Sequence, residues 1–67
     1  MEMYVVEMGY DYEGSSVVGV FATEEEALAC MREEIAEDCG DYIVVYAYRG
    51  REFRRVTFQR ITEEEEI

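Results

Sequence analysis

The chain has 67 residues, of which 17 are acidic and 6 are basic, and its formal net charge at pH 7 is −11. A chain of this length forms at most one domain, which buries only about 60% of its unfolded surface, and its acidity disfavours binding to nucleic acid or to an anionic membrane. Because 49% of the residues are hydrophobic, we expect a folded acidic domain rather than a disordered tail.

The N-terminal part of the chain predicts a β-hairpin followed by a helix. Residues 3–8 and 17–21 are rich in β-branched and aromatic residues, and the segment 11–16 between them has the composition of a turn. Thr23 and Glu26 then match a capping box, in which the threonine hydroxyl accepts from the amide of the glutamate. A helix is therefore expected to begin at this point.

The rest of the chain predicts the end of this helix and a second hairpin. Apolar residues recur every three or four positions, as one buried stripe requires, and Gly40 is the expected C-cap. Residues 42–48 and 52–60 form two further strands around the turn 49–51. The predicted fold is α+β, a four-stranded antiparallel sheet in β-β-α-β-β order with one helix on one face. Residues 1–61 form this single domain, and residues 62–67 an acidic C-terminal tail.

Alternation along the third strand separates two rows of side chains. One row is aliphatic, and the other consists of Tyr42, Val44, Tyr46 and Tyr48. We expect the aliphatic row under the helix, and the tyrosine row on the open face together with Tyr4, Val6 and Met8 of the first strand. Tyrosine is enriched in interfaces, so Tyr4, Tyr42, Tyr46 and Tyr48 form a possible second interface. Alternatively, these tyrosines simply complete a half-solvated sheet.

The carboxylates give the strongest indication of function. Between Met1 and Ala47 the chain carries twelve acidic residues and one basic residue, Arg32. The expected partner-binding residues are Glu24, Glu25, Glu26, Glu33, Glu34, Glu37 and Asp38 on the helix, with Asp11 and Glu13 in the first turn. Such a band of carboxylates imitates a phosphate backbone and attracts a basic, nucleic-acid-binding protein. Alternatively, the glutamates are good helix formers that only solvate the outer face.

Five arginines lie close together near the end of the chain. They are Arg49, Arg51, Arg54, Arg55 and Arg60. We expect them to pair with the acidic surface, because alternation points Arg54 and Arg55 to opposite sheet faces. Contact of this segment with RNA or a phosphate is the alternative.

Catalysis, metal binding and cofactors are not expected. Histidine is absent, so neither a Ser-His nor a Cys-His pair exists. Cys30 and Cys39 lie about 13 Å apart along the predicted helix, beyond disulfide reach. Two free thiols, a first segment without a basic leader and apolar stretches too short for a membrane span predict a cytoplasmic, non-enzymatic protein.

In overall character the chain resembles the small phage-encoded anti-CRISPR proteins, in particular the acidic inhibitors of type I systems from Pseudomonas-like hosts. The resemblance rests on the hairpin MYVVEMGYDYEGSSVVGVF, the acidic helix TEEEALACMREEIAEDCG and the tyrosine strand YIVVYAYRG. It implies a DNA mimic in the host cell cytoplasm that occupies the DNA-recognition groove of a Cascade subunit, a Cas protein that reads the protospacer-adjacent motif.

Two other functions remain open at this stage. A small homodimeric interaction module would work through the tyrosine-rich sheet face. An antitoxin or immunity protein would use the same acidic surface against a nuclease.

Overall fold

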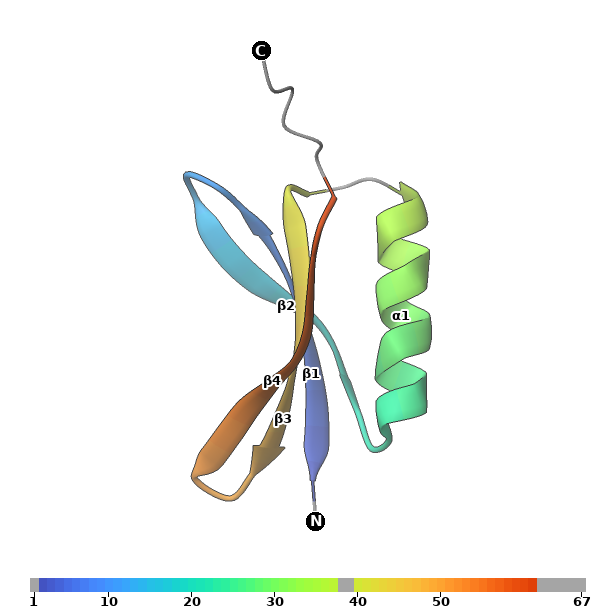
Figure 1. The fold of residues 1–67 in the computed structure, drawn as a ribbon, viewed down its shortest axis with the longest axis vertical. Helices are drawn as coiled ribbons and strands as arrows, with labels where there is room; N and C mark the ends of the chain where they lie inside the picture. The colour runs from blue at the N-terminus through green and yellow to red at the C-terminus, as the bar shows by residue number, and fades with distance from the viewer. Residues whose placement is uncertain (1, 38–39, 62–67) are drawn as a thin grey trace.

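The described residues of the chain form a four-stranded sheet with one helix. A computed structural model describes residues 2–37 and 40–61; the expected tail at 62–67 lies outside them. The elements are β1 (Met3–Tyr10), β2 (Gly14–Phe21), α1 (Glu24–Glu37), β3 (Tyr42–Arg49) and β4 (Glu52–Arg60). The antiparallel strands follow the order β2-β1-β3-β4, and α1 lies along one face of the sheet (Figure 1). The predicted α+β class and element order are confirmed.

Glycine shapes both hairpin turns. The amide of Glu13 donates to the carbonyl of Tyr10 at 3.2 Å, and Gly14 follows with φ of 81°, a left-handed conformation that favours glycine. Strand β2 therefore begins at Gly14 rather than at Val17 as predicted, because the serines after this glycine already pair with β1. Gly50 has φ of 62° in the β3–β4 turn.

The start of α1 agrees with the sequence prediction. The amide of Glu26 donates to Oγ1 of Thr23 at 3.2 Å, the first bond of the predicted capping box. The C-cap predicted at Gly40 depends on residues 38–39, which lie outside the described residues, and it stays a prediction. Gly40 is buried, and a Cβ atom at this position would overlap the side chain of Met8. Close packing against β1 therefore explains glycine here.

The core lies between α1 and the middle strands. Its buried residues are Val6, Met8, Ala27, Met31, Ile43 and Val45. Residues opposite one another on neighbouring strands share a face, and the register pairs Val6 with Val45 and Met8 with Ile43. The aliphatic row of β3 therefore lies under the helix, as predicted.

One face assignment was wrong. Tyr4, Val6 and Met8 were expected on the open face, but Val6 and Met8 belong to the buried core under α1 and Tyr4 packs against it. The opposite row of β1 consists of Met3, Val5 and Glu7, which pair with Tyr48, Tyr46 and Val44. This row shares the open face with the tyrosines of β3.

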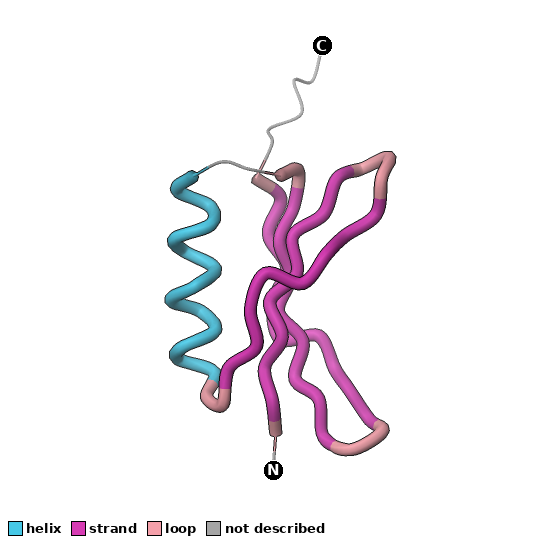
Figure 2. Tube along the Cα trace, turned by 180° about the vertical axis from the view of Figure 1, so that it is seen from behind, coloured by secondary structure: helices cyan, strands magenta, loops and turns pink. Residues whose placement is uncertain are grey.

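Each edge strand carries a β-bulge opposite a central strand. Val18 of β2 is the extra residue between the pairs Val6–Gly19 and Glu7–Val17. Val56 of β4 is the extra residue in the corresponding position opposite β3. Bulges bend a strand and increase its twist. Figures 1 and 2 show the outcome, since the ends of both hairpins lean away from α1 toward the open face.

Candidate interaction surfaces

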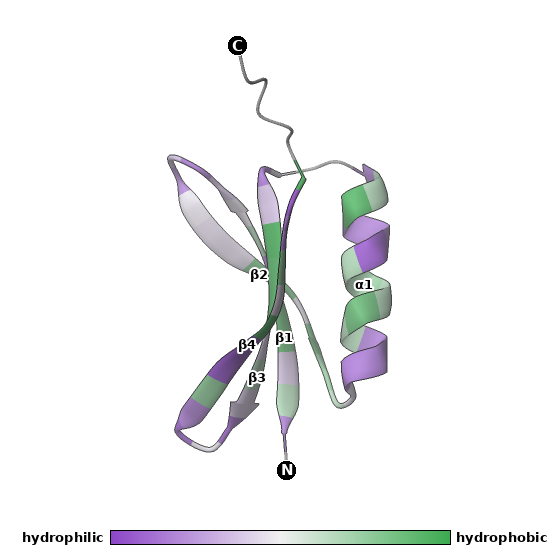
Figure 3. Cartoon of the chain, viewed as in Figure 1, coloured by the Kyte–Doolittle hydropathy of each residue, from purple (hydrophilic) through white to green (hydrophobic). Residues whose placement is uncertain are grey.

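The outer side of α1 is a layer of exposed carboxylates. Glu24, Glu25, Glu26, Glu33 and Glu37 are exposed, and Glu34 is half-buried; we call these six residues the acidic helix surface. Figure 3 shows hydrophilic residues at both ends of the helix. The predicted Asp38 lies outside the described residues. Arg32 is the only basic residue of α1, and the last turn contains none.

Most of the acidic helix surface has no arginine partner among the described residues. Arg54 pairs with Glu2 at 3.8 Å, and Arg60 pairs with Asp11 at 3.1 Å. Glu24, Glu25, Glu26 and Glu33 form no ion pair within residues 2–37 and 40–61. The expectation that the arginines fold back onto the acidic surface therefore holds for Glu2 and Asp11, but not for these four helix residues.

Three carboxylates of α1, those of Glu26, Glu33 and Glu37, follow one edge of the helix. At a rise of 1.5 Å per residue, Glu26 and Glu33 are separated by about 10 Å along the axis, and Glu33 and Glu37 by about 6 Å. Phosphates on one DNA strand advance by about 3.4 Å per nucleotide, so these intervals correspond to roughly three and two nucleotides. The same edge borders β2, because Glu26 and Glu33 line a shallow hollow with Phe21 and Cys30.

The thiol of Cys30 lies near the negative charges on this side of the helix, and they affect its pKa. This free thiol is half-buried. Burial raises the pKa of the Cys30 thiol above the ordinary 9.0, and the charges of Glu34 and Glu33 raise it further. The thiol therefore stays protonated at neutral pH and is a poor nucleophile.

Asp11 and Glu13 do not extend the acidic helix surface. Both guanidinium NH groups of Arg60 donate to the carboxylate of Asp11, at 3.1 and 3.2 Å, and the backbone amide of Asp11 donates to Asp41 Oδ2 at 2.9 Å. Glu13 is exposed in the β1–β2 turn, which leans away from α1 (Figure 1). The structure thus separates these two predicted residues from those of the helix.

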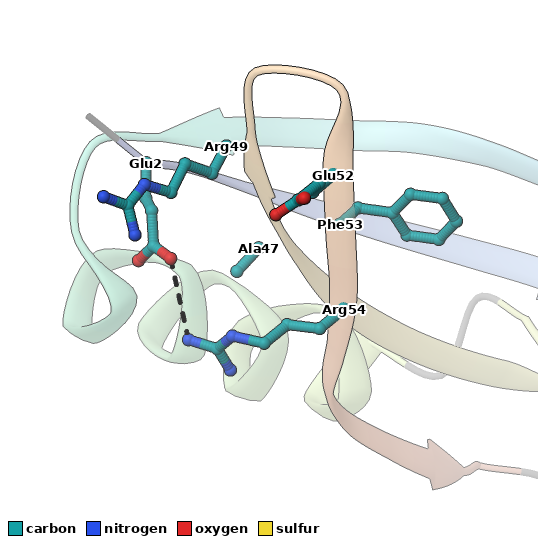
Figure 4. A pocket seen from close by; sticks show the side chains of 6 residues that line it. All are labelled: Glu2, Ala47, Arg49, Glu52, Phe53 and Arg54. Atoms are coloured by element: carbon teal, nitrogen blue, oxygen red, sulfur yellow. Dashed lines mark ion pairs between the residues drawn. The ribbon is translucent and has the colours of Figure 1, made fainter.

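The other arginines divide between the two faces of the sheet. Arg54 lies opposite Ala47 on the helix side, and Arg55 lies opposite Tyr46 on the open side, as alternation predicts. Figure 4 shows Arg54 and Arg49 extending toward Glu2 beside a hollow of about 190 Å³. The guanidinium of Arg55 instead lies 5.7 Å from the centre of the Phe58 ring, within the range of a cation–π contact.

Aromatic rings cover much of the open face. Tyr48 stacks on Phe53 with ring centres 5.1 Å apart, and Tyr42 stacks on Phe58 at 5.5 Å. Tyr46 meets Phe53 edge to face at 5.7 Å. The placement of the three β3 tyrosines on this face agrees with the prediction, and Val44 beneath them is only 3% exposed.

Tyr4 is the exception among the predicted interface tyrosines. It packs against the core on the helix side, and its hydroxyl donates to Glu2 Oε1 at 2.8 Å. This hydrogen bond raises the pKa of Tyr4 above 10.0, with smaller contributions from burial and from the charges of Glu2 and Glu24.

Sequence reasoning missed the contribution of the outer strands to the open face. The register adds Val20 and Val17 of β2 beside β1, and Phe53 and Phe58 of β4 beside β3. The available signal was Glu7, because a charged residue marks the solvent-facing row of β1 and so indicates which neighbouring rows share that face.

No family model, curated protein or solved structure matched the chain. The resemblance to anti-CRISPR proteins therefore stays a prediction. In the described part of the chain, no helix is long and apolar enough to cross a membrane. The same residues contain no cluster of three or more acidic or cysteine side chains suited to a metal ion.

Proposed function

We propose that this protein is an acidic inhibitor that places α1 on a basic, nucleic-acid-binding surface of another protein and keeps nucleic acid away from it. The observation that carries the proposal is the acidic helix surface, on which Glu24, Glu25, Glu26 and Glu33 are exposed and have no arginine partner among the described residues. A face that only solvates a protein normally mixes both signs of charge. Here α1 carries a single arginine, Arg32, and the other five arginines lie on the β3–β4 hairpin.

The chemistry of such a surface suits a phosphate-binding groove. Carboxylates on one rigid helix are held in place before binding, so fewer side-chain positions have to be ordered on contact. Their summed field also steers association with a basic partner. The intervals between Glu26, Glu33 and Glu37 match whole nucleotide steps approximately, and flexible side chains can absorb the difference.

The most specific form of this proposal is an anti-CRISPR protein that acts on the DNA-recognising subunit of a type I Cascade complex. It rests on the resemblance of the chain to small acidic inhibitors of that kind. A basic groove that reads duplex DNA is the type of surface that a carboxylate-bearing helix would fit.

A competition assay tests the proposal. Purified type I Cascade is bound to a fluorescent duplex that carries a protospacer-adjacent motif, and the protein is titrated in. We expect displacement of the duplex, with an inhibition constant that weakens as salt rises from 50 to 300 mM. If an excess of protein leaves the duplex bound at low salt, the Cascade target is wrong.

Two double variants of equal net charge provide the matched comparison. Glu26→Gln with Glu33→Gln removes two carboxylates of the helix, whereas Glu13→Gln with Glu52→Gln removes two exposed carboxylates of the hairpin turns. We expect the helix variant to inhibit about tenfold more weakly, and the turn variant to change inhibition by less than about twofold. Equal effects would show that only net charge matters and would exclude a specific role for α1.

A further inference from the structure

The open face of the sheet exposes more apolar surface than a small soluble domain usually leaves in water. Its large side chains with the greatest exposure are Phe53 at 60%, Val17 at 56%, Val20 at 53%, Phe58 at 44% and Met3 at 37%. The register places all five on the side of the sheet opposite α1. They belong to all strands except β3, whose tyrosines fill the space between them.

The charge of this face indicates which kind of partner covers it. Among the described strand residues, Glu7, Arg55 and Arg60 contribute charges to the open face, and Arg60 is paired with Asp11. A nearly neutral face provides little electrostatic attraction for a basic protein. The net charge of −11 opposes an approach by nucleic acid. A second copy of the chain presents the same apolar, nearly neutral face and therefore fits well.

The two hairpin ends add a directional contact. Both lean toward the open side, at opposite ends of the sheet (Figures 1 and 2). The β1–β2 end carries Asp11 and Glu13, whereas the β3–β4 end carries Arg49 and Arg51 beside Glu52. If two copies face each other in opposite directions, the acidic end of each lies near the basic end of the other.

We propose that two copies of the chain associate through their open sheet faces around a two-fold axis, with Glu13 of each copy near Arg51 of the other. The arrangement is isologous, because each copy contributes the same surface. It covers the exposed valines and phenylalanines and leaves both α1 helices on the outside. The proposal does not depend on the function of the acidic helix surface.

The size of the face sets the strength of this dimer. Four strands spaced by about 4.8 Å and eight residues long at about 3.3 Å each give roughly 500 Å² in projection. Side-chain relief increases this area toward the roughly 800 Å² per partner of a standard interface. We therefore expect a weak, concentration-dependent dimer with a dissociation constant in the micromolar range.

Analytical ultracentrifugation of the full chain from 5 to 500 µM tests the proposal. We expect a monomer–dimer equilibrium that tightens at least about tenfold between 20 and 500 mM salt, because salt screens the repulsion between two acidic copies. Val20→Thr with Phe53→Thr keeps a branched side chain in each strand and should weaken the dimer at least about tenfold. The circular dichroism spectrum of this variant should match that of the native chain, since both positions are exposed.

A charge exchange tests the orientation. Arg51→Glu should weaken the dimer about fivefold, and adding Glu13→Arg to it should restore the native affinity without any difference in net charge from the native chain. Arg32→Glu on the outer side of α1 makes the same change of charge as Arg51→Glu and should leave the dimer within about twofold.

Five results would overturn the proposal. The first is a monomer at all concentrations, and the second is a dimer that Val20→Thr with Phe53→Thr leaves unchanged. The third is a charge exchange that fails to restore affinity. The fourth is binding of a fluorescent single-stranded oligonucleotide that Val20→Thr with Phe53→Thr abolishes, and the fifth is pairing of two β2 edges. Hydrogen exchange detects edge pairing, because β2 amides would then become protected on dimerisation whereas face packing leaves the strand edge open.

Discussion

The glutamates of α1 should affect stability in opposite directions at the two ends of the helix. A helix is electropositive at its N-terminus and electronegative at its C-terminus. Glu24 and Glu25 lie in the first turn, where negative charge is favourable, whereas Glu33 and Glu34 lie near the C-terminus and face Glu37 at spacings of four and three residues. Neutralising the second pair should therefore stabilise the protein, and neutralising the first pair should not.

The magnitudes follow from these positions. In Glu33→Gln with Glu34→Gln, removal of two like-charge neighbours contributes about 0.2–0.5 kcal/mol each, and removal of a charge near the helix C-terminus contributes about 0.3–1 kcal/mol. The total is about 1 kcal/mol of added stability. In Glu24→Gln with Glu25→Gln, the loss of two favourable charges costs about 1 kcal/mol. Both variants gain equally from the lower net charge, so the difference between them, about 2 kcal/mol, is the quantity that tests the reasoning.

Thermal unfolding followed by circular dichroism measures this difference. A change of 1 kcal/mol shifts the Tm of a domain of this size by about 4–8 °C. We therefore expect the C-terminal pair variant to melt about 10 °C above the N-terminal pair variant in 20 mM salt. This gap should narrow in 500 mM salt, because exposed charges are screened.

Equal Tm shifts in the two double variants would refute this reasoning, because they would show that the helix carboxylates act only through the net charge. If the predicted gap appears, Glu33 and Glu34 reduce stability. If the variant Glu26→Gln with Glu33→Gln also inhibits more weakly, the two results together would indicate that the acidic helix surface serves binding rather than folding.

Three further changes test the core, the helix start and the thiol. Ile43→Ala removes a fully buried side chain and should cost about 2–5 kcal/mol in urea unfolding, much of the roughly 3–10 kcal/mol available to a domain of this size. Thr23→Ala should cost about 1 kcal/mol in the same assay, because the amide of Glu26 loses its acceptor. The raised pKa of Cys30 favours the protonated thiol in the folded state, so its contribution to stability is present below pH 9.0 and is lost as pH rises through the folded pKa. In a Cys39→Ser background, alkylation at pH 8 should be slower for Cys30 than for an unfolded thiol, and a rate equal to the unfolded one would contradict this.

The sequence predicted the order of the elements because each has a strong local signal. Thr23 marks the helix start, and the three- and four-residue apolar spacing marks its buried stripe. The face assignment of β1 failed for a different reason. Both of its rows are largely apolar, so alternation alone could not decide between them, and the pairing of Val6 with Val45 is a long-range contact.

The composition of the open face also escaped prediction, because bulges interrupt the two-residue period. Strict alternation places Phe53 and Phe58 on opposite faces, but the extra residue Val56 brings both onto the open one. Val18 has the same effect on β2, where it brings Val17 and Val20 to one face. A single sequence gives no signal for either bulge.

Strand β2 forms one edge of the sheet, and its eight residues include no charged side chain. Edge strands usually carry charges or proline that block pairing with other chains. In this protein, mutual repulsion between strongly acidic copies provides that protection at neutral pH. Near the isoelectric point of about 4.1 the repulsion disappears, and the uncharged β2 edges of neighbouring copies become free to pair. Solubility should therefore pass through a sharp minimum close to pH 4 and recover as the carboxylates ionise.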